Sequence, residues 1–203
     1  MLYSEYLRCA EKHLKFCKAF LDSYKSDVNN DLEVFMELFY ITGYVMEGLT
    51  IYSTYKIYGW PSNIGIDDIN YYDPAFVQRT NLDYFHFRFC DSNGQIVPGA
   101  DGKPKRFRNQ GLKVQSHGFQ QIAMQLLANQ GPFVNDNSTP YYGNGPLDSD
   151  VRLLIDLWKP EVRYYYRTHS SVSTLPTLNK ELITRLIDTC SLVFSQTISR
   201  VGI

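Results

Sequence analysis

The sequence predicts an all-α protein, an up-and-down bundle of four to five helices that carries a small β-hairpin insertion. Three observations predict this class. Apolar residues recur at spacings of three and four in several long stretches, as on helices that bury one face. Residues 31–58 are apolar on nearly every side, which is typical of a helix enclosed by its neighbours. Residues 61–112 instead collect turn residues and aromatics, which favours an insertion between two helices.

The first predicted helix covers residues 4–24, and the second is the apolar stretch 31–58. One face of the first helix carries regularly spaced apolar residues, namely Leu7, Ala10, Leu14, Cys17, Leu21 and Tyr24. A polar turn at 26–30 separates the two helices, and Asp31 is a suitable N-cap for the second. The Gly-Trp-Pro sequence at 59–61 ends the second helix, because proline cannot continue helical hydrogen bonding. We expect the two helices to form an antiparallel hairpin.

The insertion at 61–112 contains the signals of a hairpin. Asn93-Gly94 favours a tight turn, and residues 82–90 alternate so that three phenylalanines (Phe85, Phe87 and Phe89) share one face. A group of basic side chains could bind the phosphates of single-stranded RNA beside these aromatics, and consists of Arg88, Lys103, Lys105, Arg106 and Arg108. The alternative is a solvated hairpin whose phenylalanines pack on the helices, and the small number of charges favours it.

The second half of the chain predicts three more helices. A third helix fits residues 116–129, and residues 131–147 are rich in Asn, Pro, Gly and Ser and predict a loop. Residues 148–150 then cap a short helix that runs through Trp158 and is interrupted by Pro160. The last helix covers about 177–201, and its inward residues are Leu178, Leu182, Leu186, Cys190, Val193 and Thr197.

Composition bounds the class of protein. The 203 residues fit one domain, 1–203, and the net charge of -1 gives no global attraction to nucleic acid or membrane. The four cysteines show no disulfide spacing, and Cys9 and Cys190 fall on helix faces where buried thiols are common. There is no signal peptide and no run of about 18 apolar residues, so we expect a cytoplasmic protein that does not span a membrane.

No metal or cofactor is predicted. Cys9, His13 and Cys17 are spaced by four on the first helix, but the outer pair lies about 12 Å apart along the axis, too far to share one ion. No Gly-rich phosphate loop, zincin helix or paired Cys-x-x-Cys occurs.

Three residues carry the chemical hypotheses. Glu47 lies in the apolar second helix, where a carboxylate needs a cation, and a structural ion pair is favoured over a catalytic acid. Arg163 is the candidate partner, in an aromatic segment that we expect to be buried. Arg163 and His169 are also the minimum for metal-free cleavage of RNA, in which Arg holds the phosphate and His transfers a proton. The alternative for His169 is an exposed histidine on a serine-rich turn.

Four short motifs, in this order, resemble the HEPN domain (higher eukaryotes and prokaryotes nucleotide-binding). They are Ala10-Glu11-Lys12, Phe39-Tyr40-Ile41-Thr42-Gly43-Tyr44-Val45-Met46-Glu47, Ser116-His117-Gly118-Phe119 and Trp158-Lys159-Pro160-Glu161-Val162-Arg163-Tyr164. The resemblance covers residues 1–60 and 112–200. It implies a helical bundle, usually dimeric, with residues 61–112 as an insertion.

The resemblance also implies functions. Many members of the family are metal-independent ribonucleases that join an Arg and a His from each of two subunits, and Arg163 and His169 match that spacing. Others bind RNA or nucleotides, or assist a partner nucleotidyltransferase without catalysis. Tyr164 stands where active members usually carry a small polar residue, so the resemblance favours a non-catalytic binding or accessory protein over the endoribonuclease. A third possibility is a protein-interaction module that uses the aromatic hairpin.

Overall fold

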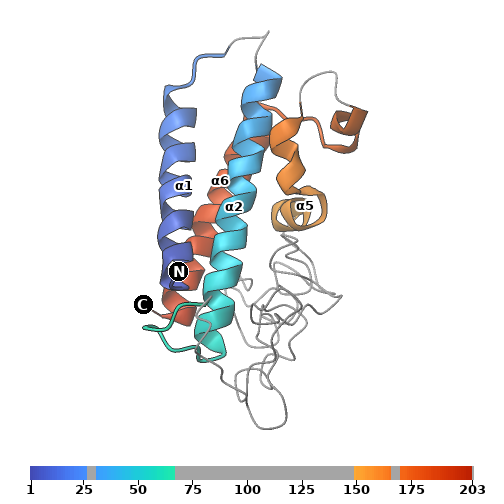
Figure 1. Cartoon of the computed structure of the whole chain (residues 1–203). Coiled ribbons are helices and arrows are strands. Elements are labelled where there is room, and N and C mark those ends of the chain that lie inside the picture. The colour runs from blue at the N-terminus through green and yellow to red at the C-terminus, as the bar shows by residue number, and fades with distance from the viewer. Residues whose placement is uncertain (27–30, 67–148, 166–169, 203) are drawn as a thin grey trace, which may run out of the picture.

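The computed structural model describes residues 1–26, 31–66, 149–165 and 170–202, and these residues are mostly helical (Figure 1). The elements in order are α1 (Ser4–Ser23), α2 (Asp31–Ile57), α5 (Ser149–Leu157), the 3-10 turns η2 (Pro160–Tyr164) and η3 (Ser170–Thr174), α6 (Lys180–Gln196) and the π-helical turn η4 (Thr197–Val201). Within these ranges there is no strand. The all-α class is therefore confirmed for them. The predicted hairpin, the 116–129 helix and the 131–147 loop lie outside the described residues.

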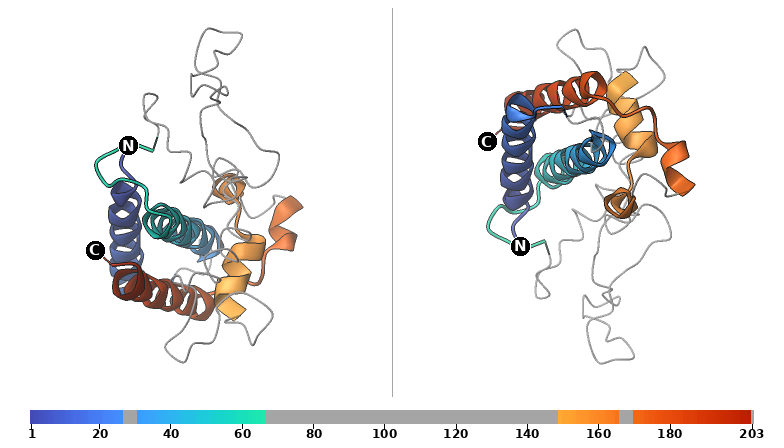
Figure 2. Two further views of the ribbon diagram at one scale, coloured as in Figure 1. Left: turned by 90° about the horizontal axis from the view of Figure 1, so that it is seen from below. Right: turned by 90° about the horizontal axis from the view of Figure 1, so that it is seen from above.

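Helix α2 is the centre of the structure. Seen along the helices, α1, α6 and α5 with η2 lie on different sides of it (Figure 2). Helix α1 runs antiparallel to α2, as predicted. The two approach closely at Gly48, where an added Cβ would lie 2.9 Å from the Tyr6 carbonyl oxygen and 3.2 Å from Ala10 Cβ. Helix α2 has no polar face because each neighbouring element covers a different part of its surface, so that it is buried on nearly every side.

The two ends of α2 are fixed in different ways. At its start, Tyr24 and Ser26 donate hydrogen bonds from their hydroxyls to the Asp31 carboxylate, at 2.5 and 2.9 Å. Asp31 is the first helical residue, so its predicted role as N-cap is wrong by one position. At the other end, Gly59 adopts a positive φ of 80°, and the amides of Gly59 and Trp60 bond back to the carbonyls of Lys56 and Tyr55. This is a Schellman motif, and it confirms the predicted stop.

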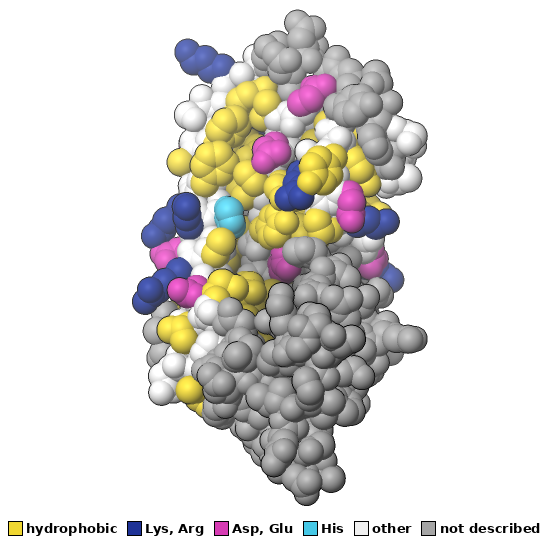
Figure 3. Space-filling model, viewed as in Figure 1, with side chains coloured by type: hydrophobic (Ala, Val, Ile, Leu, Met, Phe, Trp, Pro, Cys, Tyr) yellow, Lys and Arg dark blue, Asp and Glu magenta, His cyan; other side chains and the backbone are white. Residues whose placement is uncertain are grey.

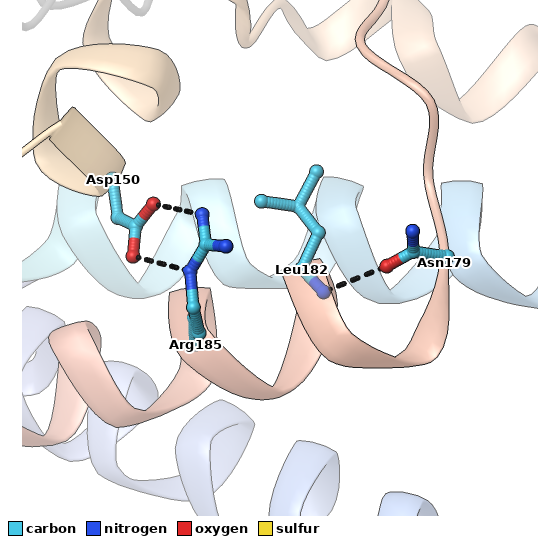
Figure 4. A network of polar contacts seen from close by, with 4 residues as sticks. All are labelled: Asp150, Asn179, Leu182 and Arg185. Atoms are coloured by element: carbon cyan, nitrogen blue, oxygen red, sulfur yellow. Dashed lines mark hydrogen bonds and ion pairs between the residues drawn. The ribbon is translucent and has the colours of Figure 1, made fainter.

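Two polar contacts connect the last helix to the chain before it (Figure 4). Asn179 is the N-cap of α6, and its side-chain oxygen accepts a hydrogen bond of 2.8 Å from the Leu182 amide. The predicted start near residue 177 is therefore a few residues early. Arg185 on α6 forms a two-pronged pair with Asp150 at the start of α5, at 2.8 and 3.2 Å. This pair joins α5 to α6 at the surface, where Arg185 remains half-exposed.

Buried thiols lie on both sides of α2. Cys17 and Cys190 are fully buried, and Cys190 contacts the Thr42 carbonyl oxygen at 3.8 Å. Burial raises the pKa of the Cys17 thiol to about 11, against a smaller lowering by Thr42. Cys17 is therefore in the thiol form at neutral pH, and both cysteines serve as packing residues. Cys9 is exposed, so its predicted burial is wrong, whereas that of Cys190 is confirmed.

Helix α2 is also apolar and long enough, by length and composition alone, to cross a membrane. An 18-residue window within it has a mean hydropathy of 1.3, although 72% of that window is buried inside the structure. The expectation that no such stretch exists is wrong by this measure. Core helices of soluble proteins pass the same test, so the finding is weak evidence of a membrane span.

Candidate ligand-binding site

Three aromatic rings from two parts of the chain form one cluster on the side of α2 that faces α5 and η2. Tyr40 and Tyr44 lie one helical turn apart and meet edge to face, with ring centroids 4.8 Å apart. Trp158, which follows α5, meets Tyr44 edge to face at 5.0 Å and lies nearly parallel to Tyr40 at 6.5 Å. The Trp158 indole N–H donates a 2.9 Å hydrogen bond to the Tyr40 carbonyl oxygen. Trp158 is 4% exposed, so its polar atom is buried but satisfied.

Gly43 makes room for that indole. A Cβ at Gly43 would lie 2.0 Å from both Cδ1 and Nε1 of Trp158, far inside any real carbon contact. Glycine in a helix interior costs about 1 kcal/mol relative to alanine. Here the missing side chain leaves a notch in the surface of α2, defined by Gly43 between Tyr40 and Tyr44, and Trp158 fills it.

Arg163 and Tyr164 lie at the surface immediately after this docking point. The η2 turn starts at Pro160, and its Val162 is 1% exposed and anchors the turn in the core. Arg163 and Tyr164 are exposed, Tyr164 by 62%. The Arg163 guanidinium donates to the Tyr164 hydroxyl and lies 4.5 Å from the centre of that ring. Hydrogen bonding to Tyr40 first, and then to Tyr164, raises the pKa of Arg163.

A hydrogen bond between two tyrosines leads from the side of α2 that faces η2 toward the interior. Tyr40 donates a 3.2 Å hydrogen bond to the Tyr44 hydroxyl. Burial is the main cause that raises the pKa of Tyr44, followed by Tyr40, with the Glu47 charge adding to it and Arg163 opposing it. The order Arg163, Tyr40, Tyr44 and Glu47 therefore runs from an exposed cation to a buried acid. The ring of His13 on α1 lies 6.3 Å from that of Tyr44, and burial, then Lys12, lowers the pKa of His13.

The predicted site residues have different outcomes. Glu47 is buried at 8% exposure, as predicted. The prediction that Arg163 is buried in the core against Glu47 is wrong, because Arg163 is exposed and donates to the Tyr164 hydroxyl. The charges of Arg163 and Glu47 both affect the pKa of Tyr44, in opposite directions. The other predicted site residues lie outside the described residues, namely His169, Arg88, Lys103, Lys105, Arg106 and Arg108.

The face that carries this cluster is rich in apolar side chains. Figure 3 shows hydrophobic groups spread over α1, α2 and the α5 region, with single charged groups between them. Two exposed large hydrophobic residues of these elements are Tyr164 on η2 and Phe16 on α1, which is 49% exposed. No group of three or more His, Cys, Asp or Glu side chains that could hold a metal occurs among the residues the structure describes. The chemistry offered by the described part of the site is therefore that of one cation, phenol hydroxyls and exposed aromatic surface.

Reasoning from the sequence missed the roles of Tyr40, Gly43 and Trp158. The available signal was Gly43 itself, since a glycine inside an apolar helix often marks a close approach. No family model, no curated protein and no solved structure matches the chain. Function is therefore inferred from the residues of the site.

Proposed function

We propose that the chain is a HEPN-like protein that binds RNA or a nucleotide through Arg163 and Tyr164, and that it acts without catalysis. The proposal includes an up-and-down bundle, the 61–112 insertion, a homodimer and an accessory role beside a partner such as a nucleotidyltransferase. One observation carries it. The exposed Arg163 guanidinium lies 4.5 Å from the centre of the exposed Tyr164 ring and donates a hydrogen bond to the Tyr164 hydroxyl.

This arrangement suits a nucleotide for two reasons. The guanidinium is a planar donor that matches phosphate oxygens, and its contact with Tyr164 reduces the side-chain entropy lost on binding. The face of the Tyr164 ring that points away from Arg163 can stack on an unpaired base, as aromatic side chains do in proteins that bind single-stranded nucleic acid. The buried Glu47 lies on the far side of two tyrosines and does not compete for this surface.

Binding of a fluorescein-labelled single-stranded RNA, followed by anisotropy, tests the proposal. Arg163→Ala is expected to weaken binding about tenfold to a hundredfold, because a hydrogen bond to a charged group contributes about 1.5–3 kcal/mol. The slope of log affinity against log salt should fall by about 0.7, the value for one lost phosphate contact on a single strand.

Arg152→Ala is the matched control. Arg152 is also an exposed arginine, on α5, and it pairs with Asp156 at 3.4 Å. It carries the same charge, so a general charge effect would weaken binding equally in both variants. Equal losses, or no RNA and no nucleotide binding by the natural protein, would refute the proposal.

The exposure of Arg163 also favours a second candidate, the metal-independent endoribonuclease. A catalytic arginine must reach the substrate phosphate, and an arginine at the surface can do so where a buried one cannot. In this candidate Arg163 steadies the phosphate and His169 transfers the proton. Structured RNA incubated in chelator with the natural protein and with an Arg163→Ala, His169→Ala double variant separates the two. Cleavage by the natural protein alone supports the nuclease, and equal cleavage or none removes it.

A further inference from the structure

We propose that Trp158 is a positioning residue for Arg163, and that its indole in the Gly43 notch sets where the ligand-binding arginine stands. This inference rests on the proposed function of Arg163. It concerns a residue that does not itself contact the ligand.

The first step concerns how firmly the Trp158 indole is held against α2. The indole fills the space of the side chain that residue 43 lacks, lies nearly parallel to the Tyr40 ring, meets the Tyr44 ring edge to face and donates to a main-chain oxygen. A helix backbone is a rigid reference, so a side chain fixed to it on three sides has one position. Trp158 is accordingly located relative to Tyr40 through both the ring and the carbonyl of that residue.

The second step is the short, stiff path from Trp158 to Arg163. Pro160 restricts the backbone at the start of η2, and the turn is closed by hydrogen bonds from the Val162 amide to the Lys159 carbonyl and from the Tyr165 amide to the Val162 carbonyl. Val162 is buried, which fixes the far side of the turn. Arg163 therefore leaves a turn anchored at both ends, and its guanidinium donates to the Tyr164 hydroxyl of the same turn. Hydrogen bonding to Tyr40 is the first cause that raises the pKa of Arg163, and Tyr40 is the residue on which Trp158 is docked.

The third step is the consequence. An arginine on an unanchored turn would sample many positions, and each phosphate contact would cost the entropy of fixing it. Docking of Trp158 removes most of that freedom before the ligand arrives. Loss of the docking should then weaken ligand binding as much as loss of Arg163, without unfolding the helices.

The test measures RNA binding and thermal unfolding of the natural protein and of three variants. These are Trp158→Phe, Arg163→Ala and the double variant that combines them. Trp158→Phe keeps a ring but removes the indole donor and part of the fit. We expect about tenfold weaker binding in Trp158→Phe, and no further loss when it is added to Arg163→Ala, while the helical circular dichroism is retained. Trp60→Phe is the matched control, because it removes an equally buried indole whose N–H donates to the Ile64 carbonyl at 3.0 Å. Trp60 belongs to the other aromatic cluster, which consists of the buried residues Tyr3, Ile51, Tyr52, Tyr55, Tyr58 and Trp60.

A second readout does not need RNA. Exchange of the Arg163 guanidinium protons with water, followed by NMR, should be slow in the natural protein, faster in Trp158→Phe and unchanged in Trp60→Phe. Tyr40→Phe, which removes the hydroxyl that donates to Tyr44 and that contributes most to the raised pKa of Arg163, should also speed exchange and serves if Trp158→Phe does not fold.

The outcomes separate the two claims. If a folded Trp158→Phe variant binds RNA and exchanges its Arg163 protons as the natural protein does, the inference is overturned and the proposed function stands. Additive losses of binding in the double variant would also overturn it, because Trp158 would then act independently of Arg163. If the natural protein binds neither RNA nor nucleotide, the proposed function fails, and the exchange rates alone decide whether Trp158 positions Arg163.

Discussion

Gly43→Ala will lower the free energy of unfolding by about 2–4 kcal/mol. The new methyl group takes the place of the Trp158 indole, which lies 2.0 Å from the Cβ position. A contact of 2.0 Å cannot be relieved by small movements of the α2 backbone or the indole. Trp158 must therefore leave the notch. Loss of a buried tryptophan costs about 3–5 kcal/mol, and alanine returns about 1 kcal/mol through its better helix propensity. Chemical denaturation of the natural and variant proteins measures the difference.

A second glycine on the same helix gives the comparison for this result. At Gly48 a Cβ would lie 2.9 Å from the Tyr6 main-chain oxygen and 3.2 Å from Ala10 Cβ, so α1 would have to move slightly away from α2, a smaller displacement than that of the indole at Gly43. Gly48→Ala should therefore be less harmful than Gly43→Ala. A stable Gly43→Ala protein, or one with natural Trp158 fluorescence in a Trp60→Phe background, would mean that the indole does not occupy the notch.

Phe39→Ala is expected to destabilise the protein by about 3–5 kcal/mol. Phe39 is fully buried on α2, and removal of its ring leaves a cavity that the surrounding helices cannot fill. Urea unfolding followed by circular dichroism measures the loss. The same substitution at Phe16, which is 49% exposed on α1, should change stability by no more than about 0.5 kcal/mol. Similar effects of the two substitutions would place Phe39 outside the core.

The long helices could be predicted from the sequence because their signals are local. The spacing of Ala10, Leu14, Cys17 and Leu21 defines the buried face of α1, and each is buried. The Gly59 stop also depends on adjacent residues alone. The start of α6 was placed too early because apolar spacing continues through Leu178, whereas the cap is set by the side chain of Asn179.

The site was less predictable because it depends on contacts between distant parts of the chain. The burial of Glu47 follows from the apolar helix around it. Arg163 was expected to be buried because aromatic residues surround it in the sequence, but a 3-10 turn places Val162 inward and directs Arg163 and Tyr164 outward. No rule of spacing joins Gly43 to Trp158, since only the packing of η2 and α5 against α2 brings them together.

The most direct test of the central claim is one NMR titration with single-stranded RNA. The claim is that Arg163, set by Trp158 on α2, presents the ligand-binding surface. We expect the Nε–H signal of Arg163 and the indole N–H signal of Trp158 to shift as RNA is added, while the indole signal of Trp60, in the other aromatic cluster, stays in place. A shift of Trp60 with no change at Arg163 and Trp158, or no shift at any of the three, would contradict the claim.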